Sequence, residues 1–148
     1  MGAAISVFER KHPTATILAD TRTPEGARKS LGEGVLPVVA LMAQHQWLKT
    51  NPGVARATAR AIKNAMQWMR GHSVEEIRAQ IPEELRMQDA DADLQAIRIV
   101  QRNLSKDGMT ESGEPESILK FVAISNEKVR TSHIDLSKLY TNEFASGK

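Results

Sequence analysis

The sequence predicts a helix-rich α/β fold, and three observations carry this prediction. Residues 52–70 place apolar and basic side chains on opposite stripes at helical spacing, which is typical of an amphipathic helix. The short run TATILA at 14–19 is β-prone and predicts a strand at 15–19. Residues 35–42 form the most apolar run and show no alternation, which predicts a strand buried on both faces.

Length and composition are those of one globular domain. The chain has 148 residues, of which 41% are hydrophobic and 26% charged, and its formal net charge is +2. That charge is too small to demand a polyanionic partner. The absence of cysteine excludes disulfides and thiolate metal sites. No apolar run approaches the ~20 residues of a membrane helix, and the first residues do not read as a secretory signal peptide.

The first third of the chain contains both predicted strands. A short helix is expected at 3–11, and Pro13 ends it because the residue before a proline avoids the helical region. The strand at 15–19 follows, and Thr23 to Gly26 reads as a turn or a helix start. A loop at 32–34 leads into the strand at 35–42, where Pro37 cannot donate to a ladder.

The remaining elements are predicted to be helices. A short helix is expected at 43–49, and Asn51 and Pro52 are good N-cap and first residues for the helix at 52–70. Its inner face is expected to hold Val54, Ala61, Ile62, Ala65, Met66 and Met69. Further helices are predicted at 74–81, 90–104 and 115–125. The first of these begins at a capping box of Ser73 and Glu76. Two strands make a marginal sheet alone, so the pattern suggests a missing partner.

Arg56, Arg60, Lys63 and Arg70 form a basic stripe on the helix at 52–70. Such a stripe could follow a phosphate backbone, but no aromatic residues lie between the charges to stack on bases. A solvated helix face is the simpler interpretation. No nucleic-acid partner is therefore predicted from it.

No metal site, cofactor or catalytic set is predicted. Asp89, Asp91 and Asp93 alternate like the start of a calcium loop, but Leu94 and Val100 occupy the positions that need glycine and glutamate. The aspartates instead suit a helix N-terminus. No two histidines have the spacing of a helical zinc site, and there is no phosphate loop or nucleophile elbow. Trp47 and Trp68 are more typical of packing than of ligand stacking.

Several strings resemble, in the same order, the C-terminal half of solute-binding proteins of the nitrate/sulfonate/taurine type of ABC importer, thiamine-pyrimidine-precursor-binding relatives included. The strings are ILADTRT at 17–23, the loop and apolar run at 32–42, KTNP at 49–52, DGM at 107–109 and IDLSKLYTNEF at 134–144. The resemblance covers nearly the whole chain. It implies a partial lobe of a two-lobed periplasmic-binding-protein fold of type II.

The resemblance also implies an organisation and a function. Residues 1–148 would be a single-domain fragment of a larger protein, with 1–20 ending the second lobe and crossing over, and 21–148 completing the first lobe. The function would be capture of a small anionic solute, such as a sulfonate or nitrate, by closure of two lobes, followed by delivery to a membrane permease. Thr21, Arg22, Thr23 and Gly34 are the expected ligand-binding residues. Arg22 could equally form a structural ion pair at the hinge.

The implied partners are the solute, the ABC permease and, to cover the missing half, a second copy of the chain. The full-length protein would be periplasmic or lipid-anchored outside the cytoplasm. It would not be an enzyme, although relatives that make a thiamine pyrimidine precursor leave that as a weaker option. The alternative function is a stand-alone helical module that binds protein or nucleic acid through the basic face of 52–70.

Overall fold

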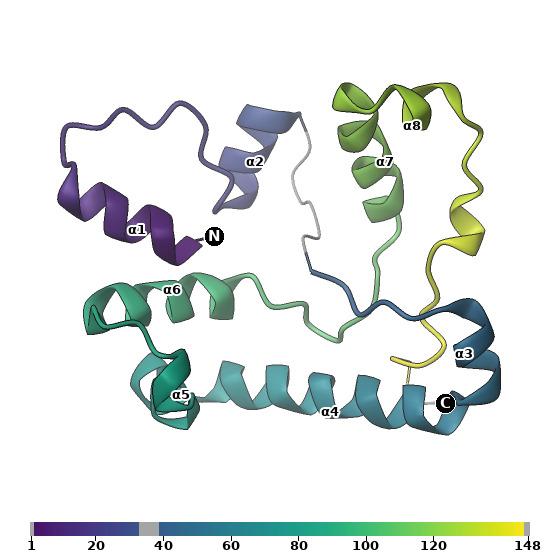
Figure 1. Cartoon of the computed structure of the whole chain (residues 1–148), viewed down its shortest axis with the longest axis horizontal. Helices are drawn as coiled ribbons and strands as arrows, with labels where there is room; N and C mark the ends of the chain where they lie inside the picture. Colours follow the sequence, from purple (N-terminus) through teal and green to yellow (C-terminus); the bar gives the residue numbers. More distant parts are fainter. Residues whose placement is uncertain (1, 33–38, 147–148) are drawn as a thin grey trace. The chain divides into compact units, whose positions relative to one another are not determined.

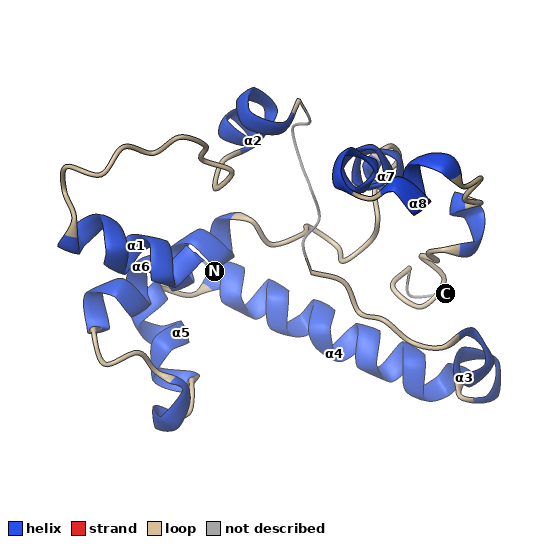
Figure 2. Ribbon diagram, turned by 45° about the horizontal axis from the view of Figure 1, so that its top comes forward, coloured by secondary structure: helices blue, strands red, loops and turns tan. Residues whose placement is uncertain are grey.

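The computed structural model describes residues 2–32 and 39–146, and in these ranges the only regular structure is helical (Figure 1 and Figure 2). The first five helices are α1 (Gly2–Lys11), α2 (Pro24–Leu31), α3 (His45–Thr50), α4 (Pro52–Gly71) and α5 (Val74–Gln80). The second half contains the 3-10 turn η1 (Glu83–Leu85), α6 (Ala90–Arg102), α7 (Glu114–Ser125), α8 (Glu127–Thr131) and the 3-10 turn η2 (Leu136–Lys138). None of the helices described combines the length and apolar character needed to cross a bilayer.

The α/β prediction is wrong for the part of the chain that the structure describes, because that part contains no strand and no sheet. Residues 15–19, predicted as a strand, belong to no helix or strand. Of the strand predicted at 35–42, residues 35–38 lie outside the described residues and 39–42 are irregular. A strand depends on hydrogen bonds from a neighbouring strand, whereas a helix satisfies its own backbone. Apolar β-prone residues alone therefore did not produce a partial lobe of the binding-protein type.

The six predicted helices all form, with ends that differ from the expected ones by no more than the usual uncertainty of about two residues. The sequence left the start of α2 open between a turn and a helix. Thr23 caps that helix and Pro24 is its first residue. The short helix α8 was not predicted, although Asn126 caps it by accepting a hydrogen bond from the Val129 N–H group.

The described residues fall into two compact units, and the first comprises residues up to 18 together with 64–106. Its core is formed by Val74, Ile77 and Ile97, with partly buried apolar side chains of Met69, Ile81 and Leu94 packed around them. Helix α6 contacts both α1 and α5. The capping box predicted at α5 is confirmed, since Ser73 Oγ accepts from the Glu76 N–H group and Glu76 Oε2 accepts from the Ser73 N–H group.

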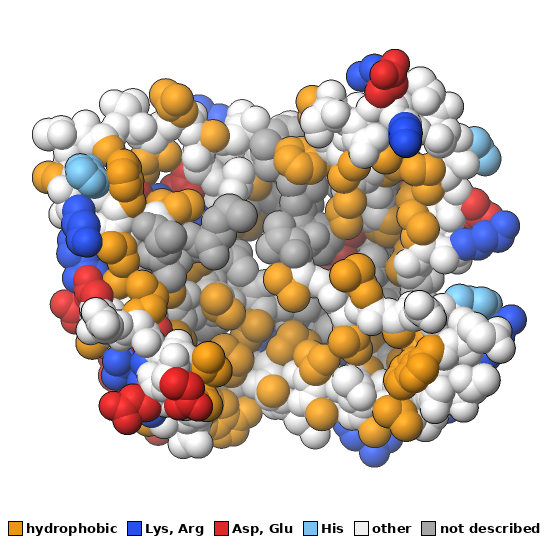
Figure 3. All heavy atoms as spheres, in the orientation of Figure 1, with side chains coloured by type: hydrophobic (Ala, Val, Ile, Leu, Met, Phe, Trp, Pro, Cys, Tyr) orange, Lys and Arg blue, Asp and Glu red, His pale blue; other side chains and the backbone are white. Residues whose placement is uncertain are grey.

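The second unit comprises residues 19–63 and 107–148. Helices α7 and α8 pack on each other, and the buried positions are few: Ala27, Ala55 and Pro115. The inner face predicted for α4 is wrong at three positions in this unit, because Val54 is 53% and Ile62 is 42% exposed and Ala61 is exposed as well. Figure 3 shows hydrophobic side chains at the surface along α4 and over α7. Periodicity located the helix correctly but did not determine how deeply its apolar face is buried.

Candidate functional site

The predicted ligand-binding residues begin in a tight turn that Asp20 and Arg22 hold together. Arg22 Nε donates to Asp20 Oδ1 at 2.8 Å, and Nη2 donates to Oδ2 at 2.7 Å. The Arg22 backbone N–H group donates to the same Oδ1 at 3.0 Å. A bidentate pair between side chains only two residues apart fixes the local backbone as well as the guanidinium. Arg22 therefore forms a structural ion pair, as in the alternative role that the sequence left open for it, although no hinge is shown.

This turn changes the titration of Asp20. The side-chain hydrogen bonds from Arg22, and then the one from its backbone N–H group, lower the pKa of Asp20 from 3.8 to about 2. Burial acts in the opposite direction and is outweighed. Hydrogen bonds to the charged form of a carboxyl stabilise the carboxylate. The turn therefore keeps Asp20 ionised, and its negative charge compensates the positive charge of Arg22.

The turn leads directly into α2. Thr23 Oγ1 accepts a hydrogen bond from the Gly26 N–H group at 3.1 Å, and Ala27 is buried. Gly26 approaches the turn so closely that a Cβ atom there would lie 2.0 Å from the Asp20 carbonyl oxygen. Any other residue at this position would force the turn and the helix apart. Asp20, Arg22, Thr23 and Gly26 thus form one rigid element, which we name the Asp20–Gly26 turn.

The four residues predicted to bind the ligand are placed as follows. Thr21 and Thr23 are exposed, and Thr23 has the additional role of helix cap. Arg22 is partly buried, with a side chain 22% exposed. Gly34 lies outside the described residues. Three of the four are consecutive, so proximity along the chain alone brings them together, and their ligand-binding role stays a prediction.

A second cluster ties the chain's tail to two other segments of the same unit. The Asn142 side chain accepts from the Thr110 N–H group at 2.9 Å and donates to the Thr110 carbonyl oxygen at 2.9 Å. Arg56 Nη2 on α4 lies 3.1 Å from Glu143 Oε1, and its guanidinium carbon is 5.7 Å from the centre of the Phe144 ring. We name these contacts the tail anchor. The sequence drew attention to the tail string, but nothing local in it indicated Thr110 or Arg56 as partners.

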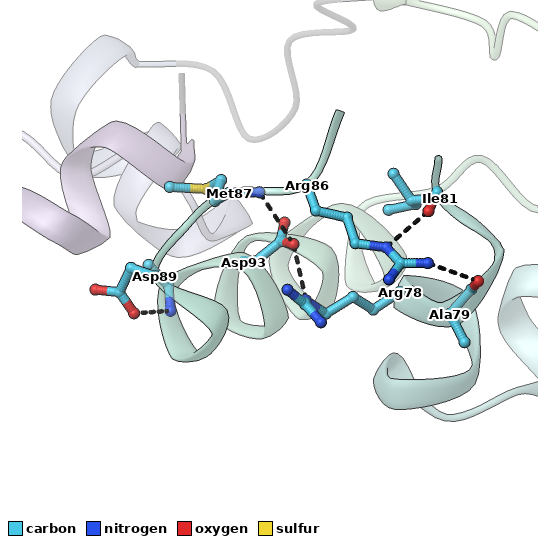
Figure 4. A network of polar contacts seen from close by, with 8 residues as sticks. Arg78, Ala79, Ile81, Arg86, Met87, Asp89 and Asp93 are labelled. Carbon is cyan, nitrogen blue, oxygen red and sulfur yellow. Dashed lines mark hydrogen bonds and ion pairs between the residues drawn. The ribbon is translucent and has the colours of Figure 1, made fainter. Parts of the chain in front are cut away.

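The three aspartates near 90 have structural roles, and Figure 4 shows the network around two of them. Asp89 caps α6 by accepting from the Ala92 N–H group at 3.1 Å, and this bond lowers the pKa of Asp89 below its ordinary value. Asp93 is 6% exposed and accepts from Arg78 Nε at 2.9 Å and from the Met87 N–H group. Asp91 lies 3.6 Å from Arg10. In the described part of the chain no three His, Asp or Glu residues are grouped as a metal site.

The basic stripe of α4 is partly used within the protein. Arg56 belongs to the tail anchor, and Arg70 donates to the Leu104 carbonyl oxygen. The side chains of Arg60 and Lys63 make no hydrogen bond or ion pair with another described residue. Two of the four cations are thus engaged in holding the protein together.

Comparison with known proteins supplies no relative: no family model, no curated protein and no solved structure matches this chain.

Proposed function

We propose that this protein is the solute-binding component of an ABC importer, or part of one. It captures a small anionic solute such as a sulfonate or nitrate and delivers it to a membrane permease. It acts outside the cytoplasm, in the periplasm or held there by a lipid anchor. It performs no chemistry on the solute. The proposal rests on the resemblance of five strings in the sequence and on one observation about how those strings are assembled.

That observation is the tail anchor. The strings that carry the resemblance fall almost entirely in the unit of residues 19–63 and 107–148, apart from Ile17 and Leu18. The tail string contributes Asn142 and Glu143, and Thr110 directly follows the DGM string. Arg56 lies one turn into the helix that KTNP begins. Segments that share a resemblance and also hold each other in place support a common origin of the whole set.

The Asp20–Gly26 turn supports the proposal at the level of chemistry. It presents the hydroxyls of Thr21 and Thr23 beside an arginine whose position is fixed, and hydroxyls and guanidinium groups are donors suited to sulfonate or nitrate oxygens. The carboxylate of Asp20 offsets part of the electrostatic attraction between Arg22 and an anionic solute. This limits the affinity that Arg22 alone can provide. A solute held here needs further donors.

The alternative function, a helical module that binds a macromolecule through the basic face of α4, has less support. Only Arg60 and Lys63 of the four cations are without a hydrogen bond or ion pair among the described residues. Two cations can contact only about two phosphates, which gives weak binding to a polyanion. Reversing the charges of Arg56, Arg60 and Lys63 would abolish binding by such a module.

The solute-binding proposal is tested by thermal shift on the protein that the complete reading frame encodes, with nitrate, taurine, other sulfonates and pyrimidine precursors as ligands. A ligand present at about 100 times its Kd stabilises the folded protein by about 2.7 kcal/mol, which gives a clear rise in Tm. We expect at least one of these solutes to raise Tm. No shift with any of them would count against the proposal.

Two variants separate the two roles of Arg22. Arg22→Gln removes the guanidinium, whereas Asp20→Asn weakens the ion pair and leaves the guanidinium in place. If Arg22 binds the anion, Arg22→Gln abolishes the shift and Asp20→Asn retains it. Equal loss in both variants would assign Arg22 to the structure of the turn alone. Arg60→Gln, which removes an exposed cation from α4, serves as the control for net charge.

A further inference from the structure

A basic groove lies along α6 in the unit of residues up to 18 and 64–106. It has a volume of about 500 Å³ and is open to solvent. Its walls include Arg10 at the end of α1 and, along α6, the side chains of Asp91, Leu94, Arg98, Ile99 and Arg102. This volume is within the range of small-molecule sites. None of these residues belongs to the Asp20–Gly26 turn or to the tail anchor.

The charges in the groove are unbalanced. Three arginines face one carboxylate, which leaves a local charge of +2 from +3 and −1. Arg10 is engaged, because its Nη1 lies 3.3 Å from Asp89 Oδ1 and 3.6 Å from Asp91 Oδ2. The side chains of Arg98 and Arg102 form no ion pair or hydrogen bond with any other described residue. The excess positive charge therefore sits on these two side chains.

Arg98 and Arg102 are four residues apart on α6 and project from the same face. Like charges at this spacing disfavour a helix, so the pair has a cost that an anion between them would remove. The helix dipole accounts for Arg102, which is in the last turn, but Arg98 is a full turn earlier. Two neighbouring guanidinium groups are well suited to the oxygens of a sulfonate, phosphate or carboxylate.

The groove also has an apolar side. Leu94 and Ile99 line it and are half-buried, so each still offers apolar surface to a ligand. An inorganic anion would contact only the arginines and leave the apolar surface of Leu94 and Ile99 exposed to water. A ligand with an apolar chain or ring would cover that surface. We propose that this groove binds a small organic anion whose charged group lies between Arg98 and Arg102 and whose apolar body contacts Leu94 and Ile99. This inference is independent of the proposed solute-binding function.

The test uses hexanesulfonate as the organic probe and sulfate as the inorganic one, measured by calorimetry and by backbone amide shifts in NMR. We compare the unaltered protein with the double variant Arg98→Gln/Arg102→Gln. The double variant Arg60→Gln/Lys63→Gln is the matched control, because it removes the same two charges from α4. Helical content by circular dichroism checks that each variant is folded.

We expect hexanesulfonate to bind at least about tenfold more weakly to the α6 variant, and within about twofold of the unaltered affinity to the α4 control. In the unaltered protein, the amide shift changes caused by hexanesulfonate should concentrate at residues 91–102 and near Arg10. This measurement locates the ligand without any variant. Equal losses in both variants would overturn the proposal in favour of non-specific attraction. Sulfate binding as tightly as hexanesulfonate would overturn the role of Leu94 and Ile99. Shifts confined to residues 20–26 would assign the ligand to the other site and overturn this one.

Discussion

Asp20 and Arg22 form a bidentate ion pair in the second unit, and this pair gives a pH prediction at the residue scale. The folded protein holds the pKa of Asp20 at about 2, below its ordinary 3.8. Because the folded value is the lower one, the pair's contribution to stability is complete above about pH 4 and is lost as the pH falls through about 2.

NMR titration of the Asp20 carboxyl carbon measures the pKa of this group directly. Arg22→Gln should raise the pKa towards 3.8, and Lys29→Gln should leave it unchanged. If the pKa of Asp20 in the unaltered protein is near 3.8, the ion pair between Asp20 and Arg22 is contradicted.

Gln101 gives a second prediction at this scale. Its Nε2 atom donates to the Met69 carbonyl oxygen at 2.6 Å and to the His72 carbonyl oxygen at 2.8 Å, at the C-terminal end of α4. The Met69 carbonyl is in the last turn of α4, where carbonyls have no partner further along the helix, and His72 follows directly after that helix. Gln101→Met keeps the length of the side chain and removes both bonds, so unfolding in urea should require about 1–2 kcal/mol less free energy. Gln67→Met, on the exposed side of α4, should change it by less than about 0.5 kcal/mol.

The elements of the first unit depend on their caps, and α5 is the clearest case. Ser73 and Glu76 satisfy each other's backbone N–H groups, and the hydrogen bonds from Ser73 lower the pKa of Glu76. Ser73→Ala should cost about 1 kcal/mol of unfolding free energy, whereas Ser73→Asp should retain most of it because aspartate is also a good N-cap. Urea unfolding followed by circular dichroism measures both. Ser132→Ala, at an exposed position, is the control. If Ser132→Ala lowers the free energy of unfolding as much as Ser73→Ala does, the stabilising role of the Ser73 cap is contradicted.

The same elements show what the sequence could and could not predict. The α4, α5 and α6 helices follow from local signals such as Asn51-Pro52, the Ser73 box and the Asp89 cap, and these are the parts predicted well. The strand at 15–19 is predicted from the β-prone run at 14–19, yet Ile17 and Leu18 are 51% and 95% exposed and belong to no regular structure. A strand needs a neighbour that local sequence does not supply. The pairing of Asn142 with Thr110 spans 32 residues and runs from side chain to backbone, so no periodicity indicates it. The ion pair of Arg22 was foreseen only as an alternative.

At the scale of the whole molecule, the tail anchor is the contact that joins distant parts of the second unit. Asn142→Ala removes two hydrogen bonds to the Thr110 backbone, whereas Glu143→Ala removes one exposed ion pair. We expect Asn142→Ala to destabilise more, because exposed ion pairs contribute about 0.2–1 kcal/mol. Hydrogen exchange at the Thr110 amide should accelerate in Asn142→Ala and remain unchanged in Lys138→Gln. Slow exchange at Thr110 in Asn142→Ala would show that the tail is held in another way.

The proposed function requires the unit containing the Asp20–Gly26 turn and the tail anchor to bind a small anionic solute. Backbone amide NMR of the protein, titrated with the solute that raises Tm most, is the decisive measurement. We expect shift changes that saturate with solute concentration and include Thr21, Arg22 and Thr23. Saturating changes that leave residues 20–26 unaffected would contradict it.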